Sequence, residues 1–309
     1  MRGRTEITAG WSDSLTELSS TVRDLNYQLK QLGRNNRDGS YATQATRAYL
    51  LSQIANQLHE LGYTGMSARS LRPKHVSALL TYWQNQRIAV GTIKNRMAAI
   101  RWWARKVNRQ RVVARGNDFY GIASRQLVST VSKARTLSTV KLARVSDPHV
   151  RLSLELQRTF GLRREEALKF RPSYADRGDH LLLKASWTKG GKERAIPIRS
   201  DEQRELLDQV WQLAGNDSLI PAHRTFIQQL RMYVRQTMNA GLSKMHGLRH
   251  GYAQRRYLEL TGRLCPVAGG PKSKALDQRA RRIDHEARLT ISLELGHERE
   301  QITSIYLGR

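Results

Sequence analysis

The sequence predicts two domains: an all-α N-terminal domain of four helices, and a C-terminal domain of mixed α+β class, mainly helical, with a small β-sheet. Three observations lead to this prediction. The chain has 309 residues, which is enough for two domains of ordinary size. Apolar residues recur at spacings of three and four in both halves. Two short apolar runs within residues 180–200, joined by a Lys-Gly-Gly-Lys turn, have the pattern of a β-hairpin.

Positive charge dominates the composition. The chain contains 53 Lys and Arg against 26 Asp and Glu, a formal net charge of +27. Such an excess in a folded protein indicates a polyanionic partner. A membrane surface is the other class of partner, but no apolar run approaches the roughly 18 residues that a membrane span needs. We therefore expect no membrane partner, and the N-terminus also lacks the apolar region of a signal peptide.

Few residues are available to bind a metal. Cys265 is the only cysteine, which excludes an internal disulfide and a Cys-based zinc site and is consistent with a reducing cytoplasm. His246 and His250 have the i, i+4 spacing of a metal pair. The residues between them include no Glu of the H-E-x-x-H type, and Arg249 would lie beside the dication. We expect neither a metal nor another cofactor.

The N-terminal domain is predicted at residues 15–110, after a flexible tail at 1–14. Apolar residues at helical spacing predict four helices, which lie near residues 16–32, 41–61, 76–83 and 92–103. A loop rich in Gly, Asn and Asp at 33–40 separates the first two helices. Thr92 is the expected N-cap of the fourth helix.

The fourth helix is basic on one face. Lys94, Arg101 and Arg105 lie at i, i+7 and i+11 beside the apolar stripe. This face is either solvated or in contact with phosphates, and the net charge favours phosphates. We expect at least one of the neighbouring Trp102 and Trp103 in the core, while the other could stack on a base.

A basic, polar linker at 111–136 leads to the second domain at 137–309. Its helical pattern begins near Leu137 and runs to Gly161, interrupted only at Asp147-Pro148. The stretch "REEALKF" continues as helix after Gly161. Further helices are expected near residues 201–213, 224–240, 246–260, 288–295 and 299–306. The segment 262–286, rich in Gly, Pro, Lys and Arg, reads as an inserted basic segment or mobile loop, partly helical near its end.

Four stretches of the second domain contain residues suited to one kind of chemistry. They lie at 159–170, 187–198, 245–257 and 295–309, and they supply Arg163, Lys189, His246, Arg249, His297 and Tyr306. The set combines two guanidinium groups, an ammonium, two imidazoles and a phenol. Cleavage of a phosphodiester through a covalent enzyme intermediate needs a nucleophile, charge stabilisation and an acid for the leaving oxygen. This set therefore suits phenolic attack on a phosphodiester without a metal.

Each residue type fits one part of that reaction. The planar donor forks of Arg163 and Arg249 match two phosphate oxygens, which a lysine point charge cannot do. Lys189, at the hairpin turn, is the candidate acid for the 5′-oxygen, and Lys184 and Lys192 compete for that role.

The remaining candidates would assist the nucleophile and the arginines. His297 can donate a hydrogen bond to the phosphate. His246 is the candidate acceptor of the Tyr306 proton, or a positioning residue. Glu166 follows Arg163 by one helical turn and can orient its guanidinium.

These stretches resemble the motifs of the tyrosine recombinase (phage integrase) family. "GLRREEAL" resembles its first arginine box, "TKGGKER" its β-hairpin lysine motif and "HGLRHGYA" its H-x-x-R box. "LGH", followed nine residues after His297 by Tyr306, resembles its final box. The four-helix region with "TIKNRMAAIRWW" is similar to the family's core-binding domain, so the resemblance covers residues 15–309.

The resemblance implies a SAM-like core-binding domain and a tyrosine recombinase catalytic domain. The implied activity is site-specific DNA recombination through a covalent 3′-phosphotyrosine intermediate, which integrates or excises a mobile element. The implied partners are double-stranded DNA recombination sites, copies of the same chain in a homotetramer, and accessory DNA-bending proteins. The implied location is the bacterial cytoplasm, in association with the nucleoid.

Two other functions stay open at this point. A type IB topoisomerase would use similar chemistry as a monomer, although the core-binding resemblance argues against it. A non-catalytic DNA-binding protein is the second alternative, but a degenerate copy should lack one of the candidate residues, and all are present.

The sequence departs from the family pattern in two places. Arg249 and His297 are 48 positions apart, longer than the usual gap, and the segment 262–286 accounts for the excess. Only Leu307, Gly308 and Arg309 follow Tyr306. In the family a segment near the tyrosine often docks on a neighbouring protomer, and segment 262–286 is the candidate to replace it.

Overall fold

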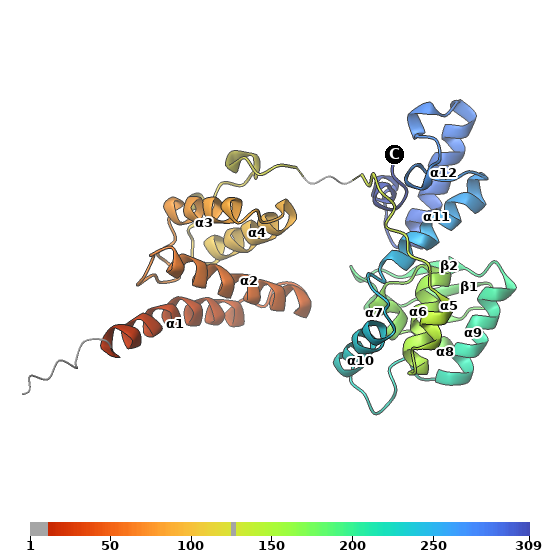
Figure 1. The fold of residues 1–309 in the computed structure, drawn as a ribbon, viewed down its shortest axis with the longest axis horizontal. Helices are drawn as coiled ribbons and strands as arrows, with labels where there is room; N and C mark the ends of the chain where they lie inside the picture. The colour runs from red at the N-terminus through yellow and green to blue at the C-terminus, as the bar shows by residue number, and fades with distance from the viewer. Residues whose placement is uncertain (1–11, 125–127) are drawn as a thin grey trace, which may run out of the picture. The chain divides into compact units, whose positions relative to one another are not determined.

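The computed structural model describes residues 12–124 and 128–309. By its contacts the chain forms two compact units, residues 1–125 and 126–309 (Figure 1). The division falls inside the predicted linker, and the detailed domain limits stay a prediction. The predicted tail at 1–11 lies outside the described residues.

The first unit is the predicted bundle of four helices. They are α1 Ser12–Asn35, α2 Tyr41–Glu60, α3 Pro73–Asn85 and α4 Val90–Lys106. Short 3-10 turns follow at Gln110–Val112 and Asp118–Tyr120. The fully buried Trp83 and Trp103 lie in its apolar core.

Two helix starts differ from the prediction. α1 begins at Ser12, so residues 12–14 of the predicted tail are helical. α4 begins at Val90, and the carbonyl of Ala89 already accepts bonds from the N–H groups of Thr92 (2.8 Å) and Ile93 (3.1 Å). Thr92 is therefore inside the first turn, and its assignment as N-cap is wrong.

The basic face of α4 is partly used within the unit. The guanidinium of Arg101 donates to the backbone carbonyls of Ala114 (Nε, 2.9 Å) and Gly116 (Nη2, 3.1 Å). Arg105 is exposed and Lys94 is half-buried. Arg101 therefore fixes the segment that follows α4, and it is the least available of the three for a phosphate.

Both tryptophans of α4 are buried. Trp102 donates from Nε1 to Oδ2 of Asp38 at 2.8 Å, and the guanidinium of Arg47 lies 4.3 Å from its ring centroid. Trp103 donates to the carbonyl of Ala68 at 2.7 Å. The expectation of at least one core tryptophan is confirmed, and neither ring is free to stack on a base.

The second unit is mainly helical with one small sheet, as predicted. Its longer helices are α6 Pro148–Phe160, α9 Asp201–Ala214, α10 Phe226–Asn239, α11 Gly247–Thr261 and α12 Gln278–Glu294. The short ones are α5 Thr139–Ala143, α7 Arg164–Leu168, α8 Pro172–Ala175 and α13 Ser304–Leu307. Additional 3-10 turns lie at Ala185–Trp187, Pro266–Ala268, Ser273–Ala275 and Glu300–Thr303.

The sheet is the predicted hairpin. Strands β1 His180–Leu183 and β2 Arg194–Pro197 are antiparallel, with His180 opposite Pro197 and Leu183 opposite Arg194. Leu183 and Arg194 are both buried, so the ladder presents one arginine to the interior. The loop 184–193 carries the candidate lysines.

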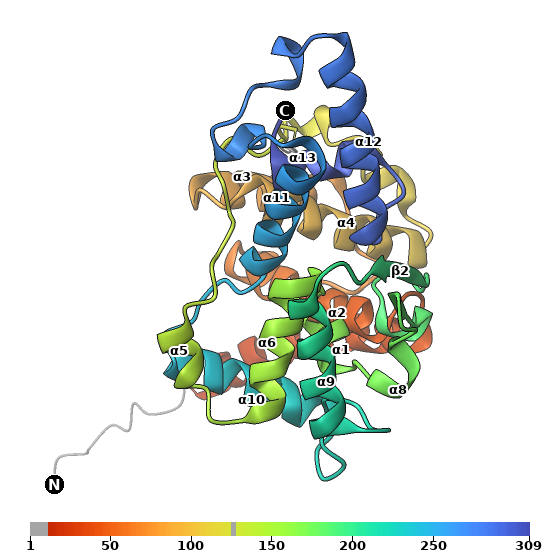
Figure 2. The same cartoon turned by 90° about the vertical axis from the view of Figure 1, so that its right-hand side faces the viewer.

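Helix α6 lies between α9 and α10 (Figure 2). Its Leu156 and Phe160 pack in a cluster with the sheet and α9, whereas Val150 and Leu154 pack in a second cluster with α5 and α10. Asp147 caps its start, since Oδ1 accepts the N–H of Val150 at 3.0 Å. Because α6 is buried on two sides, its C-terminal end firmly supports the segment that follows, which contains Arg163.

The segment 262–286 is partly helical near its end, as predicted, and its helix continues into the one predicted near 288–295. α12 begins at Gln278, with Oδ1 of Asp277 accepting the N–H of Ala280 at 2.8 Å. Its inward face alternates small apolar residues with a buried polar pair, Asp284 and Arg288. Because that face contains few large apolar side chains, hydrophobic spacing gave only a weak helical signal.

None of the described helices combines the length and the apolar character that crossing a membrane requires.

Candidate active site

Glu166 is the central carboxylate of the site. It is 0 % exposed and accepts from two arginines. Arg163 donates to it from its backbone N–H (2.7 Å) and from Nη1 (2.7 Å). Arg194 donates from Nη1 (2.9 Å) and Nη2 (2.7 Å) in a bidentate pair. Burial by itself would raise the pKa of Glu166, but the bonds and charge of Arg194, with the charges of Arg249 and Arg163, lower it to about 2.

Arg249 is buried in the first turn of α11, where it is 1 % exposed. Nη1 donates to the carbonyl of Gly161 at 2.6 Å, and Nη2 donates to the carbonyl of Leu295. Nε lies 3.3 Å from Oη of Tyr306. The carbonyl of Leu295 also accepts from Nη2 of Arg163 at 3.4 Å, so one carbonyl joins the two guanidinium groups.

Arg249 stays positively charged although it is buried. Desolvation lowers the pKa of this guanidinium to about 10, and the positive charges of Arg163 and Arg194 act in the same direction. Tyr306 and Glu166 act in the opposite direction. A pKa of about 10 keeps the group protonated at neutral pH, so it can stabilise an anion there.

Two glycines let the backbone come close to these arginines. Gly161 ends α6 at φ +64°, and a Cβ there would lie 2.5 Å from Cδ1 of Tyr252. Gly296 has φ +68°, and a Cβ there would lie 3.0 Å from Cδ of Arg194. Glycine at these two positions therefore leaves room for Tyr252 and Arg194 and adopts a backbone conformation that other residues rarely take.

The candidate nucleophile lies against Arg249 and His297. Tyr306 is 6 % exposed, and its Oη is 3.4 Å from Nε2 of His297. Burial lowers the pKa of His297 to about 4, with further contributions from the charges of Arg249 and Arg163. His297 is therefore neutral at pH 7, and it can either accept from the phenol or donate to a bound anion, depending on its tautomer.

Two further imidazoles lie at the start of α11. His246 is at the N-cap position, and its ring centroid is 5.7 Å from that of His250. Partial burial lowers the pKa of His246, and the charges of Arg249, Arg163 and Lys189 lower it further. No hydrogen bond joins His246 to Tyr306 within the described part of the chain.

His250 is a site residue that the sequence did not predict. Its ring centroid lies 4.7 Å from that of Tyr306, and its Nδ1 is buried without a hydrogen-bond partner among the described residues. Burial lowers the pKa of His250 to about 4, and the charge of His246 adds to this effect. Its position in the sequence, one helical turn after His246, was the signal that could have indicated a place in the site.

The three lysines of the hairpin loop have different environments. Lys184 lies 5.5 Å from the ring centroid of Tyr174, and Lys192 forms an ion pair with Glu298. Lys189 is exposed, and within the described residues its ammonium has no hydrogen bond or ion pair. Lys189 is near enough to lower the pKa of His246, so it faces the same side of the unit.

Arg194 is the second residue that sequence reasoning missed. In the sequence it stands among the charged residues of "GGKER", which indicates an exposed turn. In the structure it is buried on β2, donates from Nε to the carbonyl of Glu294 at 2.9 Å and holds Glu166. Only the alternation of strand residues between two faces could have indicated its burial.

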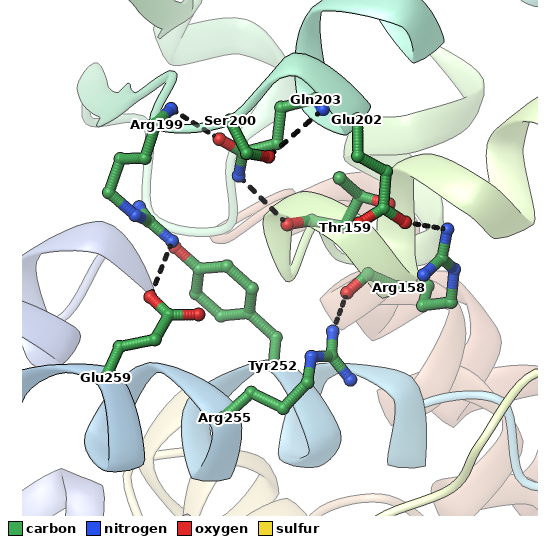
Figure 3. Close-up of a pocket in the computed structure, with 9 residues that line it drawn as sticks. All are labelled: Arg158, Thr159, Arg199, Ser200, Glu202, Gln203, Tyr252, Arg255 and Glu259. Atoms are coloured by element: carbon green, nitrogen blue, oxygen red, sulfur yellow. Dashed lines mark hydrogen bonds and ion pairs between the residues drawn. The ribbon is translucent and has the colours of Figure 1, made fainter. Parts of the chain in front are cut away.

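The cavity in Figure 3 is separate from this site. It lies at the N-terminus of α9 and contains none of the candidate residues. Its arginines are already partnered: Arg158 with Glu202 at 2.8 Å, Arg199 with Glu259 at 3.5 Å, and Arg255 with the carbonyl of Arg158 at 2.6 Å. We assign no function to it.

Within residues 12–124 and 128–309, no three His, Cys, Asp or Glu side chains are grouped so that they could hold a metal ion.

Two family models match the chain. The model described as phage integrase, N-terminal, matches residues 22–113, and the model described as integrase matches residues 122–255. The second match includes Arg163, Lys189, His246 and Arg249 but ends before His297 and Tyr306. No curated protein sequence matches.

Solved structures of DNA complexes share the fold. XerH site-specific recombinase bound to palindromic difH substrate, a post-cleavage complex, is 17% identical, with a TM-score of 0.57 over 96% of this chain and 85% of that chain. The Tn1549 transposon integrase with circular intermediate DNA is 14% identical, with a TM-score of 0.52 over 94% and 95%. A lambda integrase tetramer bound to a Holliday junction is 17% identical, with a TM-score of 0.51 over 85% and 78%.

The first prediction concerns Arg194. Arg194→Met should remove the bidentate partner of Glu166 and leave a buried carboxylate with one arginine, at a cost of about 3–5 kcal/mol in the free energy of unfolding. Urea denaturation of the purified protein measures this change. Arg204→Met removes the partly exposed ion pair with Asp176 (2.5 Å) and should cost only about 0–1 kcal/mol. Equal losses in the two variants would contradict the central role of Glu166.

The second prediction concerns pH. His250 and His297 have pKa values lowered to about 4 in the folded state, against an ordinary value of 6.5. Between these values the unfolded chain binds more protons, so stability should fall as the pH drops from 6.5 toward 4. The urea midpoint measured across this range should decrease toward acid, and His250→Phe should flatten the dependence. A midpoint that is constant over the range would contradict the burial of both imidazoles.

Proposed function

We infer the reaction of this protein from one premise: the chain belongs to the tyrosine recombinase (phage integrase) family. It is a site-specific DNA recombinase. We propose that Tyr306 is its nucleophile and that Arg163, Arg249, His246, His297 and Lys189 complete the active site. The observation that supports this proposal is the position of the Tyr306 phenol between Arg249 and His297, at 3.3 and 3.4 Å.

The proposed cleavage step is a transesterification. Oη of Tyr306 forms a bond to the phosphorus, the bond from phosphorus to the 5′-oxygen breaks, and the strand is left joined to the protein through a 3′-phosphotyrosine. Arg163 and Arg249 stabilise the charge on the non-bridging oxygens. Reversal of the step with a new 5′-hydroxyl rejoins DNA, so the energy of the phosphodiester is kept without ATP.

The two proton transfers need a base and an acid. The phenol proton passes to a neutral imidazole, and His297 Nε2 is the nearest one among the described contacts. His246 then either positions the phosphate or accepts the proton from His297. Lys189 gives a proton to the leaving 5′-oxygen, a role supported by its exposed, unpaired ammonium on the His246 side of the site.

We propose that the N-terminal unit contacts the DNA backbone. Lys94 and Arg105 are the candidate phosphate contacts on α4. Arg101 is assigned a different role, since its guanidinium already binds the carbonyls of Ala114 and Gly116. It orders the segment next to that surface.

We propose further that the protein acts on double-stranded recombination sites as a homotetramer, and that it integrates or excises a mobile element. The fold shared with the lambda integrase tetramer on a Holliday junction supports this assembly. Accessory DNA-bending proteins and a bacterial, nucleoid-associated, cytoplasmic location belong to the same proposal. The N-terminal family match favours recombination over the type IB topoisomerase alternative.

The third prediction tests the nucleophile. A nicked suicide DNA substrate should trap the wild-type protein on the 3′ end of the cleaved strand. Tyr306→Phe removes one oxygen and little volume, so the fold and DNA binding should persist while the adduct disappears. A denaturing gel measures the covalent adduct by its mobility, and a native gel shift measures DNA binding. EDTA should leave the wild-type adduct unchanged, because the proposed charges belong to the protein. An adduct that persists in Tyr306→Phe would refute the assignment.

The fourth prediction identifies the general acid. Lys189→Ala should slow adduct formation on the order of 10²-fold, as expected when a proton donor is lost. A substrate with sulfur in place of the 5′-oxygen has a better leaving group and should restore the rate. Lys192→Ala is the matched control, since Lys192 is paired with Glu298. Rescue of Lys192→Ala but not of Lys189→Ala would reassign the acid to Lys192.

A further inference from the structure

The chain that follows Tyr306 is held inside its own unit. Leu307 is fully buried in the same apolar cluster as Tyr306. The carbonyl of Gly308 accepts a hydrogen bond from Nη1 of Arg288 at 2.9 Å. Gln254 on α11 donates to the carbonyl of Tyr306 at 3.1 Å. The position of the phenol is therefore tied to contacts that the backbone makes at Tyr306 and after it.

Gly308 can bind in this way only as glycine. Its φ of 71° and ψ of −169° lie in a region that is essentially closed to other residues. A Cβ at this position would also lie 2.7 Å from Cγ1 of Val267 and 3.1 Å from the carbonyl oxygen of Ser129. Any larger residue would push the tail away from Arg288.

Residues other than the tail also hold the Arg288 side chain in place. It is 1 % exposed, and its Nε donates to Oδ1 of Asp284 at 2.9 Å. The same Asp284 accepts from Oη of Tyr257 at 2.6 Å and, through Oδ2, from the hydroxyl of Ser273 at 3.1 Å. Glu300 lies 3.9 Å from Nε of Arg288 and adds a second negative charge. A buried guanidinium with this many partners holds one orientation.

The inserted segment 262–286 supplies much of this arrangement. Ser273 and Asp284 bind Arg288 or each other, and Val267 packs against the cluster that contains Tyr306. Cys265, also from this segment, is buried in that cluster. The extra length of the chain between Arg249 and His297 thus lies against the residues that carry the phenol.

We propose that Arg288 is a positioning residue for Tyr306 and that segment 262–286 forms the socket in which the tail is held. This inference rests on the proposed function of Tyr306. Arg288 contacts neither the phenol nor the cations of the site. It acts through the carbonyl of Gly308, which keeps α13 placed so that the phenol meets Arg249 and His297.

The test measures the rate constant and the amplitude of single-turnover adduct formation at saturating protein, with the suicide substrate. Arg288→Met should bind DNA as the wild type does, and should form the adduct roughly 10²-fold more slowly, as expected for a nucleophile displaced by about 1 Å. The amplitude should stay complete, because the defect is in placement. A substrate with a 5′-thiolate leaving group should not restore the rate, since no proton donor has been lost.

A matched control separates placement from stability. Arg224→Met removes a partly buried ion pair of the same unit, with Asp147 at 2.5 Å at the start of α6. It should lower the free energy of unfolding and leave the rate constant per folded molecule unchanged. A similar rate loss in Arg224→Met and Arg288→Met would overturn the inference.

Gly308→Ala keeps the inference testable if Arg288→Met does not fold. It removes no buried charge, so the protein should fold and bind DNA, yet the adduct should form more slowly and carboxypeptidase should release the C-terminal residues faster. Adduct formation by Gly308→Ala at the wild-type rate would overturn the proposal. If instead the wild type itself forms no adduct, the proposed function has failed and not this inference.

Discussion

The buried carboxylate of Glu166 is the interaction on which the site depends. Arg163 and Arg194 bind it from two sides, and Arg249 lies near enough for its charge to lower the pKa of Glu166. Without this negative charge, three guanidinium groups would have to be gathered away from water against their mutual repulsion. With it, Arg163 and Arg249 lie close enough to share the carbonyl of Leu295 as a hydrogen-bond acceptor. Burial, together with the charges of Arg249 and Arg163, lowers the pKa of the neighbouring His297 to about 4, so its imidazole is neutral at pH 7.

Helix ends also stabilise the buried positive charge of Arg249. The carbonyls of Gly161 and Leu295, which follow the last turns of α6 and α12, both accept from Arg249. Helix C-termini carry partial negative charge, so a cation is stabilised there. The two helices are anchored in different apolar clusters, so Arg249 also joins separate parts of the unit. This explains how one buried cation can be both a structural link and a proposed catalytic group.

The proposed nucleophile lies on a very short helix. α13 spans only Ser304–Leu307, too short to be stable by itself. Its position comes from tertiary contacts: the buried Leu307, the bond from Arg288 to Gly308, and the contact of Gln254 with the backbone of Tyr306. A site built in this way places the phenol through residues that are distant in sequence.

The sequence by itself determined the two-domain, mainly helical class, the hairpin and the order of the candidate residues. These features depend on local patterns: apolar spacing along helices, a turn between two short strands, and motifs of a few residues. Only the tertiary structure decided the roles of Arg194, His250 and Arg101, because their partners Glu166, Tyr306 and Ala114 are fixed by packing and not by spacing. It also showed what segment 262–286 contacts, since Cys265 and Val267 pack in the cluster of Tyr306 while Asp284 binds Arg288. Its stabilising contacts are buried polar pairs such as Asp284 with Arg288, and a charged residue has the same appearance in a sequence whether it faces water or a partner.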